Sequence, residues 1–159
     1  TAVPTPHPIV GTFTETFQWG EGGIQNGITI LWAYTPSGMA PGLFRNMTFT
    51  EAEVGKLLTV RLLRVESEAG TEMDGIPVLI FRSHMGEVPA GEVFDFAPGA
   101  PGKEPDPRLE WLPVEHPNPR TYQWRIQPGQ YILFLSGQVQ SGSPPEYIPR
   151  SVTYSVSIE

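Results

Sequence analysis

The sequence predicts an all-β protein: a single-domain, antiparallel, jelly-roll-like β-sandwich of about nine or ten strands. Three observations predict it. Apolar and polar residues alternate with the period of a strand in several short segments. Turn residues separate these segments, and the 159 residues include 17 glycines and 18 prolines, which disfavour helices. No segment shows the period of an amphipathic helix.

The chain divides into a proline-rich N-terminal arm, residues 1–8, and a sandwich domain, residues 9–159. This length suits one domain with its own core. Pro4, Pro6 and Pro8 predict an extended, polyproline-like arm. The arm leads directly into the first expected strand, at 9–19. One face of that strand carries Ile9, Phe13, Phe17 and Trp19.

Further strands are expected along the whole domain. In 56–66 the alternation slips after Leu62, which indicates a β-bulge or a strand buried on both faces. The segment 118–142 predicts a hairpin of two strands that turns at Pro128 and Gly129. The other expected elements are strands at 24–34, 43–50, 76–82, 92–96, 108–114 (an edge strand that tolerates Pro113) and 151–159, a loop at 35–42 and one helical turn at 51–55.

Three segments share the pattern of a turn followed by a strand, or of a closing strand. They are FTEAEVGKLLTVRLLRV (49–65), IQPGQYILFLSG (126–137) and VTYSVSIE (152–159), together about a quarter of the chain. These segments resemble the bacterial pre-peptidase C-terminal family of secreted β-sandwich modules. The resemblance implies a non-catalytic extracellular module, and no site residues carry over from it.

The composition excludes several classes of function. The net charge is −7, and the 10 basic residues do not cluster, so we expect neither nucleic acid nor an anionic membrane surface as a partner. The absence of cysteine excludes disulfides, cysteine-ligated zinc and thiol catalysis. No apolar run approaches ~18 residues, so we expect no membrane insertion. The chain starts at Thr1, which we interpret as signal-peptide removal and an extracellular or cell-surface location. The alternative is that the sequence has simply been trimmed at this end.

No catalytic constellation stands out, and we expect the protein not to be an enzyme. His7, His84 and His116 are far apart in sequence, in loops or in the arm, and we interpret them as surface residues. The sequence has neither the His-Glu-x-x-His spacing of zinc proteases nor a Gly-x-Ser-x-Gly elbow. A Ser-His-Asp triad assembled across the fold is the alternative.

Calcium is the one cofactor that the sequence raises, because acidic loops supply the oxygen ligands that this cation prefers. No calcium-loop motif is matched, and the alternative is that these loops are solvated and keep the protein soluble. The candidate ligands are Glu66, Glu68, Glu72 and Asp74 in one loop and Glu104 and Asp106 in another.

Two further residues are candidate ligand or modification sites. Trp111, in an irregular segment beside Pro113, is the candidate for stacking on a sugar ring. Asn46 opens the only glycosylation sequon, NMT at 46–48, and lies on the polar side of its strand if Met47 faces the core. The other tryptophans fall on apolar strand faces, so we expect them in the core: Trp19, Trp32 and Trp124.

These features predict a non-catalytic structural subunit that self-assembles, as a filament or surface layer. Adding a strand to a neighbouring copy would satisfy an open sheet edge, and a head-to-tail contact that does not close gives a filament. The candidate interface residues are Pro4, Pro6, Pro8, Ile9, Val10 and Phe13. In one alternative, residues 1–8 are only a linker and 9–19 is the first strand of its own domain. In the other, the chain is a carbohydrate-binding module of a secreted enzyme.

Overall fold

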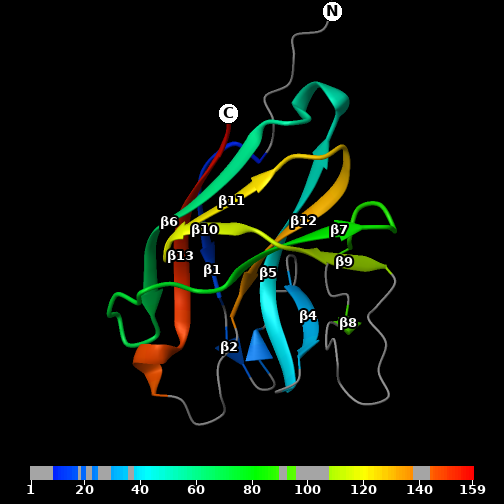
Figure 1. Cartoon of the computed structure of the whole chain (residues 1–159). Coiled ribbons are helices and arrows are strands. Elements are labelled where there is room, and N and C mark those ends of the chain that lie inside the picture. Colours follow the sequence, from blue (N-terminus) through cyan, green and yellow to red (C-terminus); the bar gives the residue numbers. More distant parts are fainter. Residues whose placement is uncertain are drawn as a thin grey trace, which may run out of the picture.

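Two large, packed β-sheets make up most of the part of the chain that the structure describes (Figure 1). The computed structural model describes residues 9–17, 42–89, 108–137 and 144–159 in full, and only the backbone of 19–20, 23–24, 30–35, 38–41 and 93–95. In this described part, a five-stranded sheet has the order β1 (Gly11–Thr16), β13 (Pro149–Ile158), β6 (Leu57–Ser67), β11 (Thr121–Arg125), β10 (Glu115–Asn118). A six-stranded sheet has the order β8 (Val93–Asp95), β4 (Ile30–Thr35), β5 (Gly38–Phe49), β12 (Gly129–Ser136), β7 (Val78–Ser83), β9 (Leu109–Leu112).

The predicted all-β sandwich is confirmed. Every neighbouring pair in the two sheets is antiparallel except β4 and β8, which are parallel. The chain passes repeatedly from one sheet to the other, for example from β5 to β6 and from β9 to β10, as a jelly-roll-like sandwich requires. The remaining described elements are the short pair β2 (Trp19–Gly20) and β3 (Gly23–Ile24) and two 3₁₀ turns, η1 (Glu51–Glu53) and η2 (Pro145–Tyr147).

The main core lies between the sheets, and strand alternation builds it. On β13, Val152, Tyr154 and Val156 are buried while the residues between them are partly exposed. Burying a side chain of this size contributes about 1.5–3 kcal/mol. The facing side chains from the six-stranded sheet include Leu43, Met47, Tyr131, Leu133 and Leu135.

The slip in the β6 pattern is a β-bulge. Leu62 pairs with Tyr154 and Arg64 pairs with Thr153, so Leu63 is an extra residue opposite no partner of its own on β13. Its side chain points out and is 46% exposed. The bulge returns Val65 to the core side, which explains why the sequence alternates on both sides of the slip but not across it.

The predicted hairpin at 118–142 is wrong in its pairing. Both strands exist, but β11 pairs with β6 and β10, whereas β12 pairs with β5 and β7 in the other sheet. The turn at Pro128 therefore carries the chain across the core. The hairpin of this region is β10–β11, in a segment expected to be only a turn. Pro117 is tolerated in β10 because this strand is one of the two edge strands of its sheet.

The expected loop at 35–42 is also wrong. β5 already begins at Gly38, and Gly38 to Gly42 pair with β4 in register, Thr35 opposite Gly38. The expected single turn at 51–55 is confirmed as η1, and 108–114 is confirmed as an edge strand, β9, that ends before Pro113. The first strand is shorter than expected, ending at Thr16.

A second apolar cluster covers the outer face of the six-stranded sheet. The inner face of β12 carries Tyr131 and Leu133, so the alternating Ile132 and Phe134 point outward, yet both are buried. Val88 is held over this face by Asn46 of β5. The Asn46 Nδ2 donates to the Val88 carbonyl (3.1 Å), and its Oδ1 accepts from the Val88 N–H (2.9 Å). The members of this cluster are Phe44, Phe81, Val88, Leu109, Ile132 and Phe134.

Gly42→Ala tests how tightly this cluster is packed. A Cβ at residue 42 would overlap the Phe134 ring and lie 2.8 Å from the Leu135 carbonyl oxygen. We expect a loss of about 1–3 kcal/mol in the free energy of unfolding, measured by urea denaturation. Gly75→Ala is the control, because its Cβ would meet nothing closer than 3.7 Å. Equal stabilities of the two variants would contradict the packing.

Candidate functional site

Strand β1 lies at one edge of the five-stranded sheet, opposite the edge formed by β10, and is held by three kinds of contact. The first is its pairing with β13, in register from Gly11 opposite Val156 to Thr16 opposite Ser151. The second is apolar: Ile9 and Phe17, just outside the strand, are 2% and 1% exposed and belong to the main core. Its outer face carries threonines, one of which, Thr14, lies with its Oγ1 3.0 Å from that of Thr153 on β13.

The third contact is an ion pair that joins the two sheets. Arg45 of β5 points into the sandwich from the six-stranded sheet, and Glu15 points in from β1. The Arg45 Nη2 donates to Glu15 Oε1 at 2.6 Å, and its Nε donates to the same oxygen at 3.0 Å. The two side chains are 34% and 17% exposed, so water screens the pair only in part.

Tyr154 and Phe13 complete this group, which we call the β1 anchor: Phe13, Glu15, Arg45 and Tyr154. The Arg45 Nε also donates to the Tyr154 hydroxyl oxygen (2.6 Å), and that hydroxyl donates to Glu15 Oε1 (3.2 Å). The Arg45 guanidinium lies 4.0 Å from the centroid of the Phe13 ring, within cation–π range.

Burial sets the protonation of the anchor. Desolvation, followed by the nearby Glu15 charge, raises the pKa of Tyr154 well above its usual value, so its hydroxyl keeps its proton and can donate. Burial alone would lower the pKa of Arg45, but Tyr154 and Glu15 outweigh it and the net shift is upward. The anchor is therefore a cation held by one carboxylate and one neutral phenol.

The sequence carried a signal for the anchor that our interpretation missed. Glu15 falls between Phe13 and Phe17 on the apolar face of its strand, and Arg45 falls between Leu43 and Met47 on the apolar face of β5. A charge in an apolar register needs a partner. One acidic and one basic residue in such positions could have been paired from the sequence.

The predicted interface arm is placed only in part. Pro4, Pro6 and Pro8 lie outside the described residues. Ile9 is buried in the core of its own chain, Phe13 packs against that core, and Val10 is 47% exposed. The geometry matches the alternative in which 9–19 contains the first strand of its own domain.

In the predicted calcium loop at 66–74, the guanidinium of Arg120 contacts the oxygen atoms that were expected to bind calcium or that lie beside them. Arg120, at the start of β11, donates to the carbonyls of Met73 (2.6 Å), Asp74 (2.9 Å) and Leu63 (3.2 Å) and to the carboxylate of Glu72 (3.2 Å). Three carbonyls and a carboxylate are a ligand set of the kind calcium uses. Here the positive charge comes from a side chain of the chain itself.

The other predicted calcium ligands are only partly placed. Glu66 accepts from Arg64 of its own strand, β6, and from Arg150 of β13, while the backbone N–H of Glu68 donates to the Ile148 carbonyl. Glu104 and Asp106 lie outside the described residues. Within the described ranges, no three His, Cys, Asp or Glu side chains are grouped as a metal site would need. Calcium binding stays a prediction.

Arg120→Ala tests whether the Arg120 guanidinium stabilises the loop at 68–76. Four charge-assisted hydrogen bonds are lost and their acceptors are left to water, so we expect a loss of about 2 kcal/mol in the free energy of unfolding. Proteolysis should also become faster in the loop at 68–76. Arg64→Ala is the control, since its ion pair with Glu66 is 60% exposed on the arginine side and is worth about 0–1 kcal/mol. Similar losses in both variants would contradict the role of Arg120.

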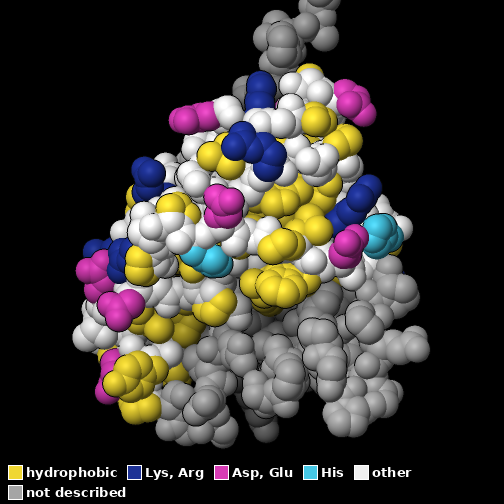
Figure 2. All heavy atoms as spheres, in the orientation of Figure 1, with side chains coloured by type: hydrophobic (Ala, Val, Ile, Leu, Met, Phe, Trp, Pro, Cys, Tyr) yellow, Lys and Arg dark blue, Asp and Glu magenta, His cyan; other side chains and the backbone are white. Residues whose placement is uncertain are grey.

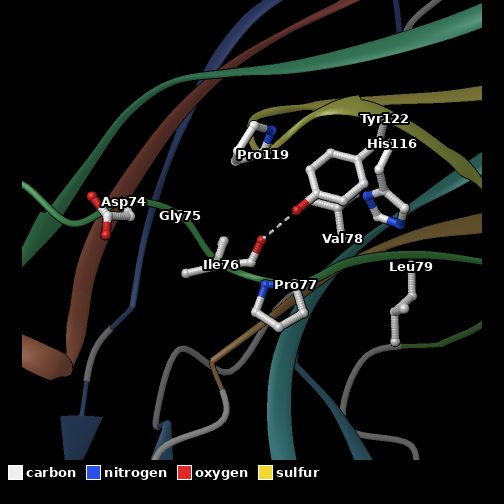
Figure 3. A pocket seen from close by; sticks show the side chains of 9 residues that line it. All are labelled: Asp74, Gly75, Ile76, Pro77, Val78, Leu79, His116, Pro119 and Tyr122. Carbon is white, nitrogen blue, oxygen red and sulfur yellow. Dashed lines mark hydrogen bonds between the residues drawn. The ribbon is translucent and has the colours of Figure 1, made fainter.

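A cleft of about 460 Å³ opens between the start of β7 and the β10–β11 hairpin (Figure 3). Ile76 and Pro77 lie on one side, with His116 and Tyr122 on the other. The Tyr122 hydroxyl donates to the Ile76 carbonyl at 3.1 Å, and burial raises the pKa of this tyrosine. With its hydroxyl engaged and its walls mostly apolar, the cleft suits a flat apolar group better than a charged one.

The two described histidines have different partners. His84 lies 3.4 Å from Glu110 at the surface, and His116 packs edge-on against the Tyr122 ring, with centroids 4.5 Å apart. His7 lies outside the described residues.

Trp111 is the exposed tryptophan that the sequence singled out. Its side chain is 58% exposed on edge strand β9, whereas Trp124 is 9% exposed and packs against Phe49 and Tyr131, as predicted. Figure 2 shows hydrophobic side chains gathered in the middle of one face, in the area of β7 and β9, with charges of both signs scattered around them. The side chains of Trp19 and Trp32 lie outside the description.

Met47 faces the core as expected, and the Asn46 side chain on the opposite face is hydrogen-bonded to the backbone of Val88. The Nδ2 that would carry a glycan donates to the Val88 carbonyl, so modification of the folded chain would require that bond to break. Glycosylation stays a prediction.

Comparisons of the chain with protein-family models, with curated proteins and with solved structures found no match. The resemblance to pre-peptidase C-terminal modules therefore stays a prediction. In the described residues no helix has the length and apolar character to cross a membrane.

Proposed function

We propose that the protein is a non-catalytic, extracellular structural subunit that assembles by exchanging strand β1 between copies. One observation carries the proposal: β1 is both the first strand of the described chain and one of the two edge strands of its sheet. An edge strand has one hydrogen-bonded neighbour, so β1 can leave by breaking only its pairing with β13. The extracellular and non-catalytic parts rest on the sequence and on the family resemblance.

The vacated site explains why β1 would be replaced. Without β1, the main-chain groups of β13 lose their hydrogen-bond partners from Gly11 to Thr16. The core also loses Ile9 and Phe17, which fill it from the edge. An open edge with empty apolar positions is a template for another strand of the same kind.

Concentration decides between the closed and exchanged forms. A strand inserted from a neighbour makes the same contacts as the strand of the same chain, so the contact energies nearly cancel. Dilution then favours the closed monomer and high protein concentration favours exchange. Gly20, Gly22 and Gly23 follow β1 in the sequence, and glycine permits the backbone changes that a hinge needs.

Exchange of β1 between copies would give an open polymer. The donated strand and the acceptor edge are different surfaces, so each copy can give one strand and receive another. Such a head-to-tail contact extends into a filament unless the rotation between copies closes a ring.

A removable disulfide tests strand exchange. Thr14 and Thr153 are paired and their Oγ1 atoms are 3.0 Å apart, which suits a disulfide after Thr14→Cys and Thr153→Cys in a chain with no other cysteine. We expect the variant oxidised as a dilute monomer to stay monomeric on concentration. The reduced variant, wild type and a Thr14→Ser, Thr153→Ser control should form filaments visible by negative-stain electron microscopy.

Oxidation after assembly gives a second readout. Exchange places the two cysteines in different chains, so non-reducing electrophoresis should show covalent ladders. If the locked monomer assembles as well as the reduced protein, the copies associate without strand exchange. If wild type stays monomeric up to millimolar concentration, self-assembly itself is wrong.

Carbohydrate binding is the second candidate, favoured by the 58% exposure of Trp111 on an edge strand. A flat indole in this position can stack on a sugar ring. We expect Trp111→Ala to weaken the affinity for any glycan retained on an array about three- to tenfold, because contact with an aromatic ring contributes on the order of 0.5–1.5 kcal/mol. Met85→Ala, at another exposed apolar residue, is the control. Binding that is unchanged by Trp111→Ala would place the glycan elsewhere.

A further inference from the structure

We infer that Arg45 and Tyr154 form a carboxylate receptor that admits only a strand with glutamate at the position of Glu15, in one register. The inference rests on the proposed exchange of β1 and names what selects the incoming strand: a second copy of this chain. Its basis is the β1 anchor, in which two donors from different sheets meet on one carboxylate oxygen.

The receptor exists only when β1 is absent. Arg45 and Tyr154 belong to β5 and β13, which stay in place when β1 leaves. The guanidinium then loses its anionic partner, and the Tyr154 hydroxyl loses its acceptor. Tyr154 is 0% exposed in the closed chain, so departure of β1 would uncover a polar group that is otherwise buried. A partly desolvated cation between two sheets favours an entering strand that brings a carboxylate and disfavours one that brings an apolar or basic group.

The threonine face of β1 cannot fix the register by itself. Thr12, Thr14 and Thr16 repeat every second residue, and their partners on β13 are Ser155, Thr153 and Ser151. A slip of two residues would keep small hydroxyl side chains opposite one another. That slip would move the glutamate carboxylate by about 7 Å, out of reach of Arg45. The single carboxylate therefore distinguishes the registers that the threonines do not.

Charge reversal tests the selection without removing the ion pair. A chain with both Glu15→Arg and Arg45→Glu keeps a pair of opposite charges and should assemble with itself. Its receptor would repel the Glu15 of a wild-type strand, and the wild-type receptor would repel its arginine. With the two proteins labelled by different fluorophores, we expect separate filaments. Two differently labelled wild-type samples are the control and should form mixed filaments.

The outcomes separate the inference from the proposed function. Mixed filaments of wild type and the double variant would overturn the carboxylate receptor and leave strand exchange standing. Monomers in every wild-type sample would overturn strand exchange, and the receptor with it.

Peptides provide a measurement that does not depend on folding of the reversed chain. A synthetic peptide of residues 9–17, IVGTFTETF, added during wild-type assembly should occupy the receptor and shorten the filaments. The same peptide with Glu15→Gln should need about tenfold or higher concentration, as expected for loss of a charge-assisted pair. A Thr12→Ser peptide is the control and should act like the unchanged one. Equal potency of the glutamine peptide would overturn the receptor.

Discussion

The rest of the structure depends on one strand being buried on both faces. β12 contributes to the main core through Tyr131, Leu133 and Leu135 and to the outer cluster through Ile132 and Phe134. A central strand of this kind needs neighbours on both edges, supplied by β5 and β7, and cover on both faces. The five-stranded sheet covers one face. On the other, Val88 lies over the strand because Asn46 holds its backbone with two hydrogen bonds.

At the edge that holds β1, an ion pair is added to the apolar packing of Ile9 and Phe17. Joining sheets through Arg45 and Glu15 adds less stability than a well-packed apolar pair would, because both charges give up water. It adds selectivity instead, since donors on β5 and β13 converge on one oxygen. The edge strand is thus held by contacts that depend strongly on which residues it carries, whereas β12 is held by general apolar burial.

Local pattern in the sequence was enough to find most strands and their inward faces, because alternation depends only on neighbouring residues. The bulge near Leu63 was visible for the same reason. Pairing was not visible: a turn at Pro128 looks the same whether the chain folds back in one sheet or crosses to the other. The β1 anchor and the Arg120 contacts join residues 30 to 139 positions apart, so alternation does not reveal them. Only the charges of Glu15 and Arg45 in apolar registers marked one pair.

The guanidinium of Arg120 has a consequence for how the loop at 68–76 responds to its surroundings. A bound metal ion exchanges with the medium, so a loop organised by one loosens when the ion is scarce or chelated. Arg120 instead reaches the Met73 and Asp74 carbonyls through its own side chain, which is covalently part of the protein. Because the Arg120 guanidinium is part of the chain, its contacts with these carbonyls do not depend on the concentration of a free ion and cannot be removed by a chelator.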